Sequence, residues 1–242
     1  MKLNDDLFVL AIPIVRDGQT NYFNLSLIVD ANHGATLVDT GLPGQHEAIT
    51  SALAEAGLGL GDLRRIILTH QDVDHIGSLH ELAQASGARV LAHQVEAPYI
   101  DGTATPRFAT AEVQARFPTM RALAERFRPT PIDQRLSDGE RLDLAGGVRV
   151  VFSPGHTPGH TCLYLERSKT LIAGDALTVE EGRLNGPNPS ATADMPAATE
   201  SVRRLAELDV RAIVCYHGGV VADDAAGQLG RVAAAMREAP AP

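Results

Sequence analysis

The 242-residue chain contains only two cysteines, and this scarcity argues against a disulfide framework. Cys162 and Cys215 lie far apart in the chain and outside any CxxC pattern. Each is in an apolar segment with the composition of a strand. We therefore expect both to be free thiols in the core of the protein.

The chain also lacks a long apolar run. No stretch approaches the roughly 20 residues that a membrane-spanning helix needs. The sequence LFVLAIPIV at residues 7–15 follows two aspartates and has no small-residue cleavage site after it. It therefore fits a buried strand better than a signal peptide. These features predict a soluble, cytoplasmic protein with no membrane partner.

Basic residues are too few and too scattered to form a nucleic-acid surface. The formal net charge is -9, and the chain has no Lys/Arg run. Such a balance would repel a phosphate backbone, so nucleic acid is a poor candidate as substrate or partner. We expect a small-molecule substrate instead, and a homodimer stays open.

The composition, 44% hydrophobic and 21% charged, is that of an ordinary globular protein. At this length a single domain over residues 1–242 is expected, and only the Ala/Pro tail at residues 239–242 is predicted to be disordered. Short strands over residues 7–15, 23–30 and 35–39 open the chain. Strand and helix then alternate, with strands over 64–70 and 88–93. One helix is expected over 44–57, where Ile49, Leu53 and Ala56 recur at helical spacing, and another over 74–87, ending at Gly87.

The middle of the chain interrupts this pattern. Residues 98–131 are predicted to be a helical insertion with one long helix over residues 111–127. The second half repeats the order of strands followed by helices, with strand-forming segments over 140–155 and 161–175, a helix over 197–208, a strand over 210–216 and a helix over 222–237. The expected fold class is α/β, with two mixed β-sheets packed face to face and flanked by helices.

A dense run of polar side chains follows the predicted strand at residues 64–70. The sequence THQDVDHIG contains His70, Asp72, Asp74 and His75 within six positions. In an extended loop, residues 70, 72 and 74 project to the same side, and His75 can turn back as the next helix begins. An Asp-rich helix cap would explain the aspartates but neither histidine, so we interpret the run as a metal site.

Later segments complete the pattern, with His156 in SPGHTPGHT, Asp175 in LIAGDAL and His217 in CYHGG. Together they resemble the metallo-β-lactamase superfamily, whose usual first run is H-x-H-x-D-H. Here that run reads H-x-D-x-D-H, with Asp72 at a position that is normally histidine. FNLSLIVDANHGATLVDTGLPG near the start also matches, so the resemblance spans most of the chain.

The resemblance implies a four-layer αββα sandwich with two metal ions at one edge of the sheets. His70, Asp72 and His156 would hold the first ion, Asp74, His75 and His217 would hold the second, and Asp175 would bridge them. The ions would be zinc, with manganese or iron as alternatives. A metal-bridging hydroxide would attack the substrate, and Asp74 would orient it and carry its proton to the leaving group.

The aspartate at position 72 changes the formal charge of the ligand set. It adds one negative charge relative to a histidine, so we expect a weaker Lewis acid and greater tolerance of hard ions such as manganese or iron.

Three further residues have competing interpretations. Asp39, in the sequence DTG, resembles the catalytic triplet of aspartic proteases, but no second DTG occurs, so a structural aspartate in a turn is favoured. His160 follows a Pro-Gly turn and is expected to support the site rather than to bind metal. For His93, at a strand end, an active-site role and a structural role stay equally open.

The substrate is less defined than the reaction. Only residues 218–242 follow His217, which is short for the helical segment of glyoxalase-II-like enzymes. No tyrosine occurs between Ala176 and Cys215, where N-acyl homoserine lactonases have one. A small ester, thioester or lactone is the substrate class that remains. The alternatives are an iron-dependent oxidoreductase similar to persulfide dioxygenases and a non-catalytic metal-binding regulatory protein.

Overall fold

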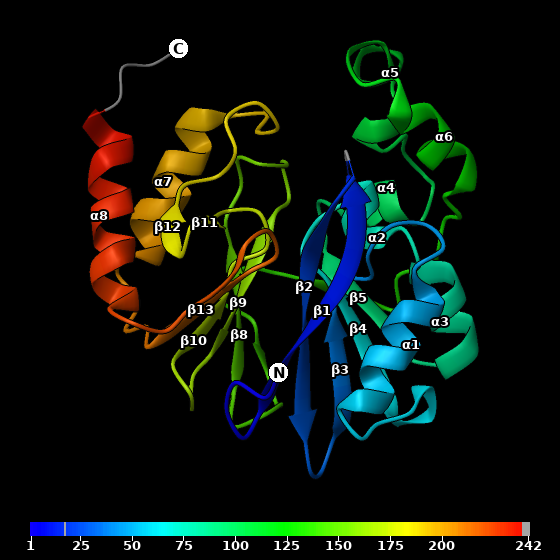
Figure 1. Cartoon of the computed structure of the whole chain (residues 1–242), viewed down its shortest axis with the longest axis horizontal. Coiled ribbons are helices and arrows are strands. Elements are labelled where there is room, and N and C mark those ends of the chain that lie inside the picture. The colour runs from blue at the N-terminus through cyan, green and yellow to red at the C-terminus, as the bar shows by residue number, and fades with distance from the viewer. Residues whose placement is uncertain (17, 239–242) are drawn as a thin grey trace. The chain divides into compact units, whose positions relative to one another are not determined.

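The computed structural model describes residues 1–16 and 18–238, which fall into two compact units (Figure 1). The first unit comprises Met1–Asn21 and Leu25–Leu136, and the second comprises Tyr22–Asn24 and Ser137–Pro242. The single-domain organisation stays a prediction. The tail at residues 239–242, predicted to be disordered, lies outside the described residues.

The first unit is built on a six-stranded mixed sheet in the order β1-β2-β3-β4-β5-β6. β2 and β3 pair antiparallel, and each of the pairs from β3 to β6 is parallel. The strands are β1 (Leu7–Arg16), β2 (Gln19–Asp30), β3 (Gly34–Val38), β4 (Leu63–Leu68), β5 (Arg89–His93) and β6 (Gln134–Leu136). Because β3, β4 and β5 run parallel, the loops that follow them emerge at one edge of this sheet.

Helices flank the sheet of this unit, and α1 and α3 lie beside its strands in Figure 1. α1 buries Ile49 and Leu53, the residues whose helical spacing predicted it. The helical elements are α1 (His46–Glu55), η1 (Leu60–Asp62), α2 (Val73–Ile76), α3 (Leu79–Ser86), α4 (Ala97–Ile100), η2 (Arg107–Ala109), α5 (Ala111–Arg116) and α6 (Thr119–Arg126).

Two segments that were predicted to be single helices are each divided into two helices. The helix expected over residues 74–87 consists of the short α2 and the separate α3, although α3 does end at Gly87 in the left-handed conformation (φ 68°). The helix expected over residues 111–127 is divided into α5 and α6. Pro118 explains this second break, because proline disfavours helical geometry in the residue before it, and Phe117 is not helical, with φ -130° and ψ 85°.

The second unit has its own six-stranded mixed sheet, in the order β14-β13-β10-β9-β8-β7, and a separate two-stranded ribbon. β10 and β13 are parallel, whereas β8, β9 and β10 are antiparallel neighbours. The strands are β7 (Arg141–Leu142), β8 (Val148–Phe152), β9 (Thr161–Leu165), β10 (Thr170–Ile172), β13 (Ala212–Cys215) and β14 (Gly219–Val221), and the ribbon is β11 (Thr178–Glu180) with β12 (Arg183–Asn185). A hairpin turn over residues 166–169 connects β9 and β10.

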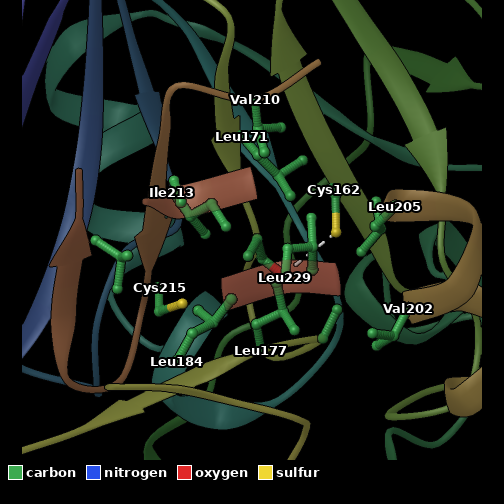
Figure 2. Close-up of a cluster of buried hydrophobic side chains, with 14 of the residues drawn as sticks. Cys162, Leu171, Leu177, Leu184, Val202, Leu205, Val210, Ile213, Cys215 and Leu229 are labelled. Atoms are coloured by element: carbon green, nitrogen blue, oxygen red, sulfur yellow. Dashed lines mark hydrogen bonds between the residues drawn. The ribbon is translucent and has the colours of Figure 1, made fainter. Parts of the chain in front are cut away.

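The helices of this unit, α7 (Met195–Leu205) and α8 (Ala225–Glu238), pack beside each other. α7 begins two residues earlier than predicted, because the Asp194 side chain caps it by accepting a 2.9 Å hydrogen bond from the Ala197 N–H. Figure 2 shows the buried apolar cluster of this unit, to which the sheet and both helices contribute. Cys162 and Cys215 lie in this cluster as free, fully buried thiols, as predicted.

The α/β fold class is confirmed: the chain forms two mixed β-sheets with helices. Among the described residues, no helix combines the length and apolar character that crossing a membrane requires.

Candidate metal centre

The run His70–His75 forms a compact cluster in the first unit, where β4 ends and α2 begins. His70 and His75 are fully buried, and their ring centroids are 4.0 Å apart. His70 Nε2 lies 3.4 Å from Asp72 Oδ2, and His75 Nε2 lies 3.9 Å from Asp74 Oδ2. The structure therefore brings together all four residues that the sequence grouped here.

Asp39 fixes the orientation of the His75 ring. This buried carboxylate follows β3, and its Oδ2 atom lies 2.9 Å from His75 Nδ1. A carboxylate accepts, so Nδ1 carries the proton and donates it, which leaves the lone pair of Nε2 for a metal ion. Asp39 is thus a positioning residue, and the structural role preferred from sequence understated its contribution.

The same carboxylate reaches the His70 ring through Thr69. The Thr69 hydroxyl lies 2.8 Å from Asp39 Oδ2 and 3.0 Å from His70 Nδ1. Because the hydroxyl donates to the carboxylate, it can accept from His70 Nδ1–H, which leaves His70 Nε2 with its lone pair. One aspartate therefore sets the tautomer of both histidines.

Backbone contacts hold the His75 turn against the segment after Asp39. The Thr40 N–H donates to the His75 carbonyl at 2.7 Å, and the Gly77 N–H donates to the Gly41 carbonyl at 2.8 Å. A Cβ atom on Gly77 would lie 2.3 Å from the backbone nitrogen of Pro43. Only glycine fits at position 77, because the nearest atoms that a Cβ would meet belong to the backbone of Leu42 and Pro43.

Glu96 and Arg107 of this unit contact the loop that carries Gln71 and Asp72. The buried Glu96 carboxylate accepts the Gln71 N–H at 2.9 Å, and the Gln71 side-chain oxygen accepts the Arg107 N–H at 2.9 Å. Arg107 also donates to Asp72, with 2.5 Å between Nε and Oδ1 and a second short contact from Nη2 to Oδ2.

The other three predicted ligands meet in the second unit around Asp175. Asp175 Oδ2 lies 3.4 Å from His156 Nε2 and 3.3 Å from His217 Nε2. His156 and Asp175 are buried, and His217 is the most exposed of the three. A single carboxylate oxygen therefore lies within 3.4 Å of a nitrogen atom of each histidine.

His160 supports this trio without being available to a metal. Its Nε2 accepts the Asp175 N–H at 3.0 Å, so the proton is on Nδ1, which lies 2.9 Å from Ser153 Oγ. This arrangement agrees with the supporting role predicted for His160. His93 is buried at the end of β5, where its Nδ1 lies 3.4 Å from the Val95 nitrogen, and its place in a site stays open.

The His156 loop is fixed by the start of α7. The Asp194 N–H donates to the Gly155 carbonyl at 2.9 Å, and the Ala193 N–H donates to the His156 carbonyl at 3.3 Å. Gly155 has φ 137°, and a Cβ there would lie 2.3 Å from the Ala198 nitrogen. The glycine therefore permits both the backbone conformation and the close helix contact.

The donor atoms within each unit fit metal coordination. Ligands at about 2.0–2.2 Å from a tetrahedral zinc ion lie about 3.3–3.6 Å from each other. Three donor pairs, at 3.4, 3.4 and 3.3 Å, match that edge length, whereas His75 Nε2 and Asp74 Oδ2 are farther apart, at 3.9 Å. The nitrogen and oxygen donors also suit zinc, manganese and iron.

The cysteines do not belong to this chemistry. Burial raises the pKa of the Cys162 thiol to about 12, although a hydrogen bond with Ser153 opposes the shift. Burial also raises the pKa of Cys215 well above its ordinary value. Both thiols therefore stay protonated near neutral pH, where they are neither nucleophiles nor metal ligands.

Known proteins share both sequence and fold with this chain. A family profile described as the metallo-beta-lactamase superfamily matches residues 20–217. A probable metallo-hydrolase, YflN of Bacillus subtilis, is 31% identical over 203 residues, covering 77% of this chain and 76% of the relative. A hydroxyacylglutathione hydrolase of Fuscovulum blasticum is 30% identical over 212 residues, covering 86% of this chain and 65% of that enzyme.

A solved structure agrees with these matches. A metallo-beta-lactamase family protein from Thermus thermophilus superimposes with a TM-score of 0.76 and 32% identity, covering 98% of this chain and 81% of that one. The likeness extends over both units and includes the segments that carry the predicted ligands.

Proposed function

Because this chain belongs to the metallo-β-lactamase superfamily, we propose that it is a dinuclear metal-dependent hydrolase of a small ester, thioester or lactone. Hydrolysis is the activity that the names of its metallo-hydrolase and hydroxyacylglutathione hydrolase relatives share, and the first of these names also specifies a metal. We propose four details beyond what these names say: two ions per chain, zinc as the metal, the substrate class and a cytoplasmic location.

Each predicted ligand is assigned to one of two ions, as the family resemblance implies. His70, Asp72 and His156 would hold one ion, Asp74, His75 and His217 would hold the other, and Asp175 would bridge them. The carrying observation is that Asp175 Oδ2 lies 3.4 and 3.3 Å from two histidine nitrogens, which suits a shared oxygen ligand. When bound, the ions would lower the pKa of a water molecule and polarise the bond under attack.

The protein side chains then have separate tasks. Asp39 keeps the His75 Nδ1 atom protonated and, through Thr69, does the same for His70, so both rings present Nε2. Asp74 is partly exposed, with a quarter of its side chain accessible, and is the candidate to accept a proton at a carboxylate oxygen and pass it to the leaving group. His160 holds the Asp175 backbone.

The overall charge and the relatives support the proposed substrate class. A net charge of -9 disfavours polyanionic substrates such as RNA. The hydroxyacylglutathione hydrolase relative is named for a thioester substrate, but this chain spans only 65% of it. We infer a small ester, thioester or lactone as the substrate, with the insertion at residues 98–131 as a candidate cover for its pocket.

A substrate panel tests this proposal. Protein stripped of metal and reloaded with zinc, manganese or iron should hydrolyse at least one of a series of small esters, thioesters and lactones, and the stripped protein should not. Turnover of a phosphodiester alone would refute the substrate class. Oxygen consumption by the iron form, without hydrolysis, would establish the oxidoreductase alternative.

A further inference from the structure

We propose that Arg107 is a positioning residue that converts Asp72 into a replacement for histidine, by orienting its carboxylate and offsetting its charge. This inference rests on the proposed metal site. It concerns the pair of residues that the first unit places side by side, Asp72 at the variant motif position and Arg107 in η2 of the insertion.

The pair has the geometry of a two-point contact. Arg107 Nε lies 2.5 Å from Asp72 Oδ1, and Arg107 Nη2 contacts Asp72 Oδ2, so the planar guanidinium engages both oxygens. Only 27% of the arginine side chain and 15% of the aspartate side chain are exposed. Two-point contacts of this kind fix the plane of the carboxylate, and partial burial reduces screening by solvent.

Arg107 is itself held in place. Its N–H donates to the Gln71 side chain at 2.9 Å, and the Gln71 N–H is bound to Glu96. The next residue, Phe108, is buried and packs edge to face against Phe127, with ring centroids 5.3 Å apart. Because the backbone around Arg107 is anchored on both sides, holding the guanidinium on Asp72 costs little additional conformational entropy.

This contact leaves Asp72 able to bind an ion. A carboxylate has about four lone-pair positions, and the guanidinium uses one on each oxygen. Asp72 Oδ2 still lies 3.4 Å from His70 Nε2, which is the edge length expected between two ligands of one zinc ion. Hydrogen-bonded carboxylates are the normal state of metal ligands, and their partners set the ligand orientation.

The charge of the arginine changes the expectation drawn from the motif. Counted alone, Asp72 adds one negative charge to the ligand set relative to a histidine. The Arg107 guanidinium adds one positive charge in direct contact with it. The Asp72–Arg107 pair therefore matches a neutral histidine in net charge, and the weaker Lewis acidity expected from sequence should largely disappear while the pair is intact.

Metal affinity measured without substrate tests the pair. Zinc binding to metal-free protein is followed by competition with a chromophoric chelator, and cobalt(II) binding by visible absorption. Arg107→Ala should weaken one of two zinc equivalents by about 10–100-fold and alter the cobalt spectrum. Arg107→Lys should recover only part of that loss, because lysine restores the charge but not the two-point contact.

An exchange of the aspartate completes the test. Asp72→His should also weaken zinc binding, because it leaves the guanidinium facing an ion and a neutral ring. The double variant Asp72→His/Arg107→Ala should regain most of the wild-type affinity. Arg121→Ala is the matched control, since it removes an exposed arginine of the same insertion that pairs with Glu125, and it should leave both affinities unchanged.

The outcomes separate this inference from the proposed function. If the wild-type protein binds two zinc ions and Arg107→Ala binds both equally well, the inference about Arg107 is overturned and the metal site stands. The inference would also be overturned if the double variant bound zinc as weakly as Arg107→Ala. A loss of zinc affinity caused only by a disturbed structure around position 107 would persist with histidine at position 72. If the wild-type protein binds no metal, both proposals fail.

Discussion

Replacing Asp39 with asparagine should weaken metal binding without disturbing the fold. Asp39 has φ 65°, and asparagine is one of the few residues that tolerate this left-handed conformation. The substitution is nearly isosteric and removes one charge. It therefore isolates the role of the carboxylate as a hydrogen-bond acceptor.

The size of the effect follows from the contacts of that carboxylate. Asp39 accepts the Thr69 N–H at 2.8 Å and lies 2.9 Å from His75 Nδ1, so both of its oxygens are in use. An asparagine offers one oxygen and one NH2 group. With its oxygen toward His75, the NH2 group faces the Thr69 N–H; with its oxygen toward Thr69, the NH2 group faces His75 Nδ1–H unless that proton moves to Nε2. That move removes the metal-binding lone pair, so we expect a loss of about 10–100-fold in zinc affinity, equivalent to about 1.4–2.8 kcal/mol.

Chelator competition at constant pH measures this loss directly. Asp143→Asn is the matched control, because Asp143 is an exposed aspartate of the second unit, and its zinc affinity should equal that of the wild type. If Asp39→Asn bound zinc within twofold of the wild type while remaining folded, the assignment of Asp39 as the residue that orients His75 would be refuted.

Three further predictions concern turnover and stability. Asp74→Ala, reloaded with metal, should lose on the order of 100-fold or more in kcat, and near-normal turnover would remove Asp74 from the proton-transfer role. His160→Ala should lower the free energy of unfolding in urea by about 1–3 kcal/mol, because the buried Asp175 N–H loses its acceptor; an unchanged midpoint would contradict this. Since burial raises the Cys162 pKa from 9.0 to about 12, the unfolded thiol ionises first, and between these two pH values this thiol should lower stability by about 1.4 kcal/mol per pH unit; the fall should be shallower by that amount in Cys162→Ala, and equal slopes in the two proteins would show that this thiol has no such effect.

Much of the fold was accessible from the sequence because its signals are local. The apolar periodicity at Ile49 and Leu53 predicted α1, and Gly87 predicted the end of α3. The failures were also local in origin. Pro118 divides the predicted helix over residues 111–127, because a proline disfavours helical geometry in the residue before it.

The candidate ligands could be found because they occur in dense, recognisable runs, and each unit does gather its own share of them. The residues that support them had weaker signals. Asp39 had the DTG sequence, which indicated a turn but not its contact with His75. Glu96 and Arg107 reach the ligand loop from other elements. Contacts at such sequence separations depend on tertiary structure, and no local pattern encodes them.

The most direct test of the dinuclear assignment is the number of zinc ions bound by the purified chain. Metal-free protein titrated with zinc and then analysed by elemental mass spectrometry should retain two ions per chain. His217→Ala should reduce this number to one, with the remaining ion held by the other ligand set. Retention of no ion by the wild-type protein, or of a single ion that the His217 substitution leaves unchanged, would contradict the proposed dinuclear centre.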